Sequence, residues 1–166
     1  MDAELFKTLF GYSNWARDRL LSAMDGLTEE DYAKANGFTY GSLRGIITHT
    51  ISAEAGYLAR WQGQPVERIT AELAPDVPAL AARWQQEEPR VQAFLSTLTD
   101  TELERDVVSV RRSGEEYRRP LWVDMMQILN HGTQHRSEAA EALTMIGRSP
   151  GDLDFSAYMS QRARQD

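Results

Sequence analysis

Four long stretches of this chain repeat apolar residues at helical spacing, and this pattern constrains the fold more than any other feature. In each stretch the apolar side chains fall on one face of a helix and the polar ones on the other. Such helices must bury their apolar faces against one another, so the sequence predicts an all-α four-helix bundle. The stretches run from about Leu5 to Met24, from Ser42 to Trp61, from Val77 to Leu98 and from Leu121 to Ile146.

Capping residues and helix breakers define the expected boundaries. Thr28, with Asp31 three residues later, predicts a short helical turn after the first long helix. Gly147 followed by Pro150 is a typical end for the last one. Pro89 lies inside the third helix, so we expect it to kink that helix or split it in two.

One segment departs from the helical pattern. Val107 to Arg112 is rich in β-branched residues, Ser113-Gly114 is typical of a two-residue turn, and residues 115–119 form a second extended run. Together they predict a small accessory β-hairpin just before the last long helix. The tail from Gly151 to Asp166 should add a short helix that docks on the bundle.

Composition limits the classes of function. The 166 residues show no repeat and no linker, so we expect one domain over residues 1–166. The absence of cysteine excludes a disulfide framework, thiolate metal ligands and a cysteine nucleophile. A net charge of -7 argues against a duplex nucleic-acid partner. The first ten residues do not resemble a signal peptide and no apolar run reaches ~18 residues, so we expect a cytoplasmic protein without a membrane partner.

The histidines form the most informative small pattern. The chain has only three, His49, His131 and His135. The last two are separated by Gly132-Thr133-Gln134, so they form an i, i+4 pair on one face of the predicted last helix. Such a pair can hold one metal ion at Zn–N distances of about 2.0–2.1 Å. All three lie at the margin of the apolar arc of their helices, which suits a half-buried site open to a ligand.

A structural interpretation competes with a metal site. A lone histidine on an amphipathic helix, such as His49, is more often a packing or solvated residue, whereas the pair on the last helix leaves both interpretations open. Glu138, Gln127 and Asp124 share the face of that pair. They would orient the ligands or handle protons in a functional site, and would otherwise be solvated. Arg60 shares the face of His49 and would contact an anion.

The chain resembles the DinB/YfiT-like family of small bacterial four-helix-bundle proteins over nearly its whole length. The specific part is the histidine pair on the last helix with His49 upstream, whereas the match in the first helix is weak by itself. The resemblance rests on Tyr12-Ser13-Asn14-Trp15-Ala16, Ser42-Leu43-Arg44-Gly45-Ile46-Ile47-Thr48-His49, Asn130-His131-Gly132-Thr133-Gln134-His135-Arg136 and Gly151-Asp152-Leu153-Asp154-Phe155.

This resemblance implies a divalent ion, often nickel or zinc, held by His49, His131 and His135 with open positions for water. It also implies a dimer, and characterised relatives include transferases and isomerases that use low-molecular-weight thiols such as bacillithiol or mycothiol. Three neutral imidazoles leave an ion its +2 charge and an open position, as in catalytic sites. Bound water then has a pKa of about 7, and a bound thiol is held as the thiolate. Without cysteine in the chain, any thiol must come from a cosubstrate.

Three hypotheses follow. The first is a divalent-metal-dependent enzyme, a thiol transferase or a hydrolase, acting on a small molecule in stress or detoxification. In it Glu138 is the first general base to test, and Gln127 and Arg60 would bind substrate. The alternative is a non-enzymatic metal-binding or sensing dimer with the same three histidines. The third is a purely structural helical dimer, which would bind no metal.

Overall fold

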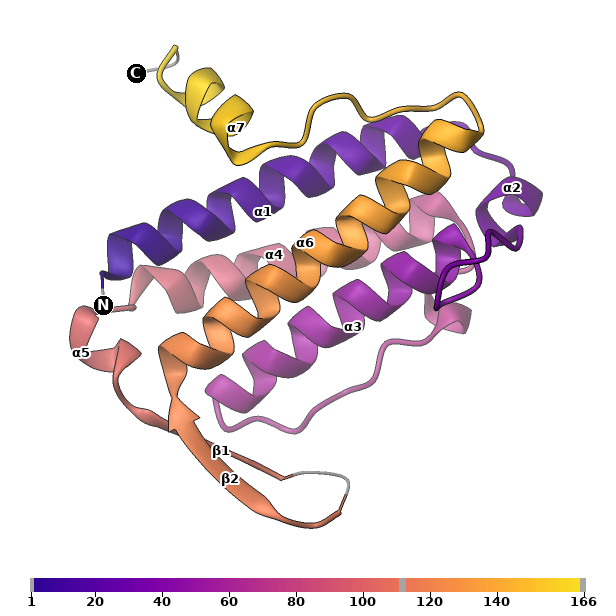
Figure 1. Ribbon diagram of the computed structural model, residues 1–166. Helices are drawn as coiled ribbons and strands as arrows, with labels where there is room; N and C mark the ends of the chain where they lie inside the picture. The colour runs from indigo at the N-terminus through magenta and orange to yellow at the C-terminus, as the bar shows by residue number, and fades with distance from the viewer. Residues whose placement is uncertain (1, 111–112, 165–166) are drawn as a thin grey trace.

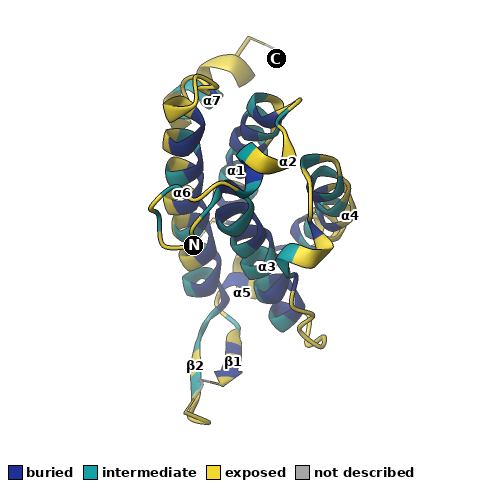
Figure 2. Ribbon diagram, turned by 90° about the vertical axis from the view of Figure 1, so that its right-hand side faces the viewer, coloured by how far each residue is buried: buried dark blue, intermediate teal, exposed yellow. Residues whose placement is uncertain are grey.

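The computed structural model describes residues 2–110 and 113–164 and shows a bundle of four long helices (Figure 1). Helix α6 lies at the front of Figure 1 between α1 and α3, and α4 lies behind them. The side view agrees, because α6 and α4 appear on opposite sides of α1 and α3 (Figure 2). The predicted all-α bundle with a small hairpin is confirmed. The four helices are α1 Ala3–Met24, α3 Leu43–Trp61, α4 Val77–Ser96 and α6 Leu121–Met145.

Shorter elements connect the long helices. As predicted, the Thr28 side chain accepts a hydrogen bond from the Asp31 amide and caps a short helix. Thr99 caps another in the same way by accepting from the Glu102 amide, and this helix was not predicted although its sequence carries the same signal. The short elements are α2 Glu29–Ala33, the 3₁₀ turn η1 Ala71–Leu73, α5 Asp100–Leu103, β1 Asp106–Val110, β2 Glu116–Pro120 and α7 Phe155–Arg162.

Helix α4 continues through Pro89, so of the two predicted outcomes, a kink or a split, the split does not occur. A proline inside a helix removes the hydrogen bond to the carbonyl four residues earlier and crowds that carbonyl. Here the carbonyl belongs to Gln85, and both Gln85 and Pro89 are exposed. Solvent can therefore satisfy the freed carbonyl group, which lowers the cost of keeping one continuous helix.

The predicted hairpin exists. Strands β1 and β2 pair antiparallel, with Asp106 opposite Pro120 and Val110 opposite Glu116. Ser113 and Gly114 lie in the connection between the strands, and the two-residue turn stays a prediction. Arg111 and Arg112, which the prediction put in the first strand, lie outside the described residues.

The core is divided into two hydrophobic clusters along the bundle. One lies toward α2 and includes Tyr32 and Ile47, and the other lies toward the hairpin and includes Phe6 and Leu103. Buried residues line the inward sides of the long helices (Figure 2). Between the clusters lie four polar side chains that we call the inner polar cluster: Ser13, Arg17, Glu54 and Arg136.

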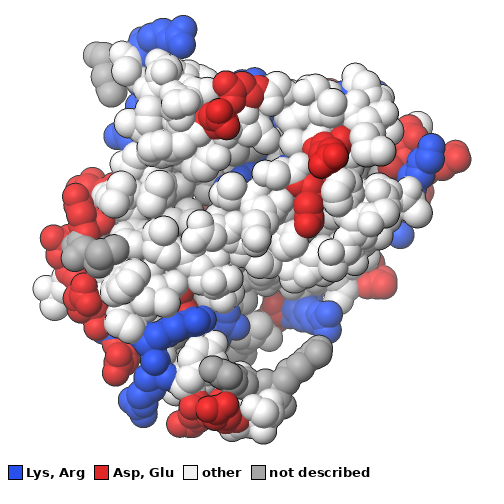
Figure 3. All heavy atoms as spheres, in the orientation of Figure 1, with Lys and Arg blue, Asp and Glu red and all other residues white. Residues whose placement is uncertain are grey.

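The face on which α6 lies toward the viewer carries its charged side chains mainly around the rim, and its centre is largely uncharged (Figure 3). Lys and Arg atoms are most prominent toward the hairpin end of this face. Within residues 2–110 and 113–164, no helix combines the length and the apolar character that crossing a membrane requires.

Candidate metal centre

The three histidines meet where α3 and α6 run side by side. His49 comes from α3, whereas His131 and His135 lie one turn apart on α6. One ring nitrogen of each lies within 4.8 Å of those of the other two. The Nε2 atoms of His49 and His131, 82 residues apart in sequence, are 3.0 Å from each other. His49 and His131 are half-buried, as predicted, and His135 is buried.

The electrostatics of this three-His cluster favour neutral imidazoles. Burial, with smaller contributions from the neighbouring His131 and His135, lowers the pKa of His49 to about 4. Burial also lowers the pKa of His131, again with a contribution from His135. At neutral pH both rings therefore keep a nitrogen lone pair, the form that binds a metal ion.

A carboxylate orients one ring of the cluster. Oε2 of Glu138 lies 2.8 Å from Nδ1 of His135, one turn earlier on α6. A proton held on Nδ1 by this carboxylate leaves Nε2 as the free ligand atom. Nδ1 of His131 is buried and has no hydrogen-bond partner among residues 2–110 and 113–164. Glu138 therefore lies within hydrogen-bond distance of His135, and its predicted role toward a metal ligand stays a prediction.

These residues fit a transition-metal ion. Nitrogens bound at about 2.0–2.1 Å to one ion lie roughly 3 Å apart, which is close to the 3.0 Å between Nε2 of His49 and Nε2 of His131. Imidazole nitrogen is a ligand that zinc, nickel, copper and iron accept. The cluster can therefore hold an ion that keeps a position for a further ligand.

The other predicted site residues do not join the cluster. Gln127 lies on α6 one turn before His131 but is exposed to solvent. Arg60 is eleven residues after His49, about 16 Å along α3 at 1.5 Å per residue. Its guanidinium lies 4.2 Å from the centre of the Tyr57 ring, and its Nε is buried. Arg60 is therefore packed on its own helix, away from the histidines.

Asp124 serves the fold instead of the site. Its side chain is fully buried and pairs with Arg119 of β2. Its other oxygen accepts a hydrogen bond of 3.4 Å from Nε1 of Trp61, at the end of α3. Asp124 thereby ties the hairpin and α3 to the start of α6, and its carboxylate is already engaged.

The sequence analysis missed Tyr40. This residue lies in the loop before α3, and its ring stacks on that of His49 with centroids 3.9 Å apart and planes 16° apart. The same ring meets His135 edge-on at 5.2 Å. The available signal was an aromatic residue beside Gly41, directly before the helix that carries the first histidine.

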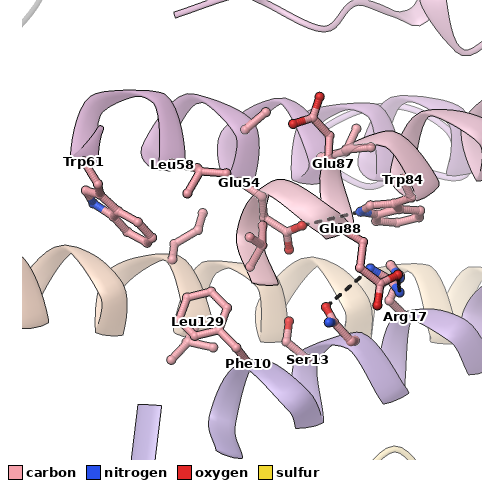
Figure 4. A pocket seen from close by; sticks show the side chains of 15 residues that line it. Phe10, Ser13, Arg17, Glu54, Leu58, Trp61, Trp84, Glu87, Glu88 and Leu129 are labelled. Atoms are coloured by element: carbon pink, nitrogen blue, oxygen red, sulfur yellow. Dashed lines mark hydrogen bonds and ion pairs between the residues drawn. The ribbon is translucent and has the colours of Figure 1, made fainter. Parts of the chain in front are cut away.

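A second polar region occupies the opposite sides of the same helices. Figure 4 shows a cavity between the long helices, with Glu54 and Trp84 pointing into it from α3 and α4. The cavity measures about 30 Å³. Nε1 of Trp84 donates a 3.4 Å hydrogen bond to Glu54, and Arg17 pairs with Glu88 at 2.9 Å. Burial raises the pKa of Glu54, and the positive charge of Arg136 opposes that rise.

Comparison with known proteins gives concordant matches. The model of the DinB family matches residues 1–166. "Protein DinB" of Bacillus subtilis is 20% identical, and the match covers 91% of this chain and 91% of that protein. A crystal structure of a DinB-like protein from Bacillus cereus superposes with a TM-score of 0.69 at 17% identity, covering 90% of this chain and 95% of the other. The structural match shows that the two chains share a fold.

Proposed function

The chain belongs to the DinB family, and on that premise we propose that it is a divalent-metal-dependent enzyme built around His49, His131 and His135. One observation carries the proposal, the convergence of three imidazole nitrogens within 4.8 Å of one another. Three histidine ligands are typical of catalytic sites, because structural sites usually have a fourth protein ligand. Nickel and zinc are the ions we favour.

We propose thiol transfer or hydrolysis of a small molecule as the reaction class, in stress or detoxification. A bound divalent ion supplies Lewis acidity that favours the deprotonated form of water or a thiol. The chain has no cysteine, so a low-molecular-weight thiol would have to be the cosubstrate. Glu138 holds the proton on Nδ1 of His135 and keeps the ring in one orientation. We propose a homodimer, as the family resemblance implies, and a cytoplasmic location.

Metal analysis of the untagged protein tests the site. We expect about one nickel or zinc per chain, and its loss in His49→Ala, His131→Ala and His135→Ala. Gln134→Ala is the matched control, because Gln134 is exposed on the same turn of α6. Absence of metal after incubation with nickel and zinc, in a protein with native circular dichroism, would refute the proposal and favour a purely structural bundle.

An activity screen separates an enzyme from a metal sensor. The loaded protein is assayed with a panel of low-molecular-weight thiols and electrophiles, and with small ester and amide substrates. We expect turnover that each histidine variant abolishes and Gln134→Ala preserves. Stoichiometric metal without turnover of any compound in the panel would favour the non-enzymatic metal-binding protein instead.

A further inference from the structure

Tyr40 covers the outward side of the three-His cluster, and this inference about it rests on the proposed function. Its hydroxyl oxygen lies 2.8 Å from Nε2 of His49. We propose that Tyr40 is the residue that recognises the exogenous ligand of the metal centre, by donating a hydrogen bond to a small anionic or hydroxylic group. The ligand class is therefore a compact oxyanion, thiolate or similar anion that shares the ion with the histidines.

The fold devotes specific residues to placing Tyr40. In the preceding loop the amide of Gly41 donates to the carbonyl of Phe38 at 2.9 Å, and Gly41 itself has a φ of 76°, which glycine adopts readily. On α3, a Cβ at Gly45 would lie 2.0 Å from the carbonyl oxygen of Tyr40. Only glycine at position 45 lets the Tyr40 backbone rest against the first turn of the helix.

A metal ion in the cluster would free the hydroxyl proton. In the structure the Tyr40 hydroxyl is hydrogen-bonded to Nε2 of His49 at 2.8 Å. The same Nε2 lies 3.0 Å from Nε2 of His131, so an ion held there would take up the lone pair that this hydroxyl meets. The hydroxyl would then be free to donate its proton to a third atom, on a ligand bound to the ion.

The Tyr40 side of the cluster is open to solvent. Tyr40 has 37% of its surface exposed, unlike the core tyrosine Tyr32. This exposure leaves an approach to the cluster for a small ligand.

Anion binding to the Co²⁺-loaded protein tests this role without relying on turnover. Metal affinity is measured first by competition with a chelator, and azide is then titrated while the visible Co²⁺ spectrum is recorded. We expect Tyr40→Phe to keep metal affinity within about threefold and to weaken azide binding about 10-fold or more, as loss of a hydrogen bond to a charged group predicts. Phe preserves the stacked ring. Tyr12→Phe is the matched control, since that hydroxyl lies on α1 and donates to the Leu153 carbonyl instead of contacting a histidine.

The possible results are distinguishable. Wild-type protein that binds no Co²⁺, nickel or zinc would overturn the proposed function and this inference with it. Metal binding with equal azide affinity in wild type and Tyr40→Phe, or with no azide binding to either, would overturn the role of Tyr40 alone. A fall in metal affinity of more than 10-fold in Tyr40→Phe would make Tyr40 a direct ligand and refute the role as a hydrogen-bond donor.

Discussion

Two polar regions lie on opposite sides of α3 and α6, and their charges are arranged in opposite ways. In the three-His cluster, burial and the neighbouring imidazoles lower the pKa values of His49 and His131. The inner polar cluster gathers arginines and a carboxylate, so its charges compensate one another. A region with compensated charges is complete without a ligand. A region of converging lone pairs is completed by a cation, which is why we place function on the outer side.

The volume of the inner cavity and the solvent exposure of the three-His cluster also favour placing function on the outer side. The inner cavity of about 30 Å³ has room for water, which needs at least 10–15 Å³, but not for an organic ligand. The outer cluster has two half-buried histidines and is covered by a tyrosine that is 37% exposed. Each region can be altered separately, so substitutions on one side should leave the properties of the other intact.

The largest expected effect is a loss of stability on changing the inner polar cluster. Arg136 is 5% exposed, and its Nη1 donates to Oγ of Ser13 at 2.8 Å. Arg136→Met should lower the free energy of unfolding by about 3–5 kcal/mol, because Glu54 is left buried without its opposing charge. Urea denaturation measures this loss. The double variant with Glu54→Gln should recover part of this stability. A loss below about 1 kcal/mol in Arg136→Met alone would show that the charge of Arg136 does not stabilise buried Glu54.

The next effect is on the outer side and concerns metal affinity instead of stability. Glu138→Gln weakens the acceptor that holds Nδ1 of His135, so we expect a 10- to 100-fold loss of metal affinity, or about 1.4–2.8 kcal/mol. Chelator competition measures this change. Glu141→Gln removes an exposed carboxylate from the same helix and should leave the affinity unchanged. Equal affinities in the two variants would show that Glu138 does not orient the ligand.

Local patterns predicted the elements of the fold, because each depends on neighbours along the chain. Helical spacing predicted the four long helices, and Thr28 predicted the start of α2. The prediction was weaker where solvent exposure decides, as at Pro89, whose exposed position permits a continuous helix. Exposure depends on tertiary packing and cannot be read from a proline alone.

Prediction of the candidate site was limited even more strongly by its dependence on tertiary packing. The histidines were identifiable because a helix brings residues four apart onto one face. The structural role of Asp124 could not be predicted, since its partners Arg119 and Trp61 come from other elements. Tyr40 was missed because its position depends on the close approach of a loop to Gly45. Contacts between elements distant in sequence, or made through loop geometry, leave no periodic signal.

The two regions should also differ in how pH affects stability. A lowered pKa means that the unfolded state binds the His49 proton more readily, so the metal-free protein should lose stability as pH falls from 6.5 to about 4. After solvent screening of a half-exposed group we expect about 1–2 kcal/mol. The pKa of Glu54 is raised, so the folded state binds this proton more tightly than the unfolded state does. The protein should therefore lose the stability that protonated Glu54 contributes as the pH rises above 4.5.

Urea unfolding between pH 4 and 8, with chelator present, separates these contributions. His49→Gln should flatten the fall in stability below pH 6.5. Glu54→Gln should remove a loss that grows with rising pH, so the stability of this variant should increase more steeply with pH than that of wild type. A change of slope in the same direction in both variants would contradict the opposite electrostatics of the two regions.

The smallest effect comes from Gly132, which lies between His131 and His135 but faces the inner polar cluster. An added Cβ would lie 2.8 Å from Nη1 of Arg136 and 3.6 Å from Oε1 of Glu54. Alanine favours the helix by about 1 kcal/mol, whereas displacing Arg136 weakens charged hydrogen bonds of about 1.5–3 kcal/mol. Gly132→Ala should therefore destabilise the protein by about 1 kcal/mol and leave metal affinity within about twofold. A gain in stability would show that Arg136 has room to move, and a large loss of metal affinity would show that the two sides of α6 are not independent.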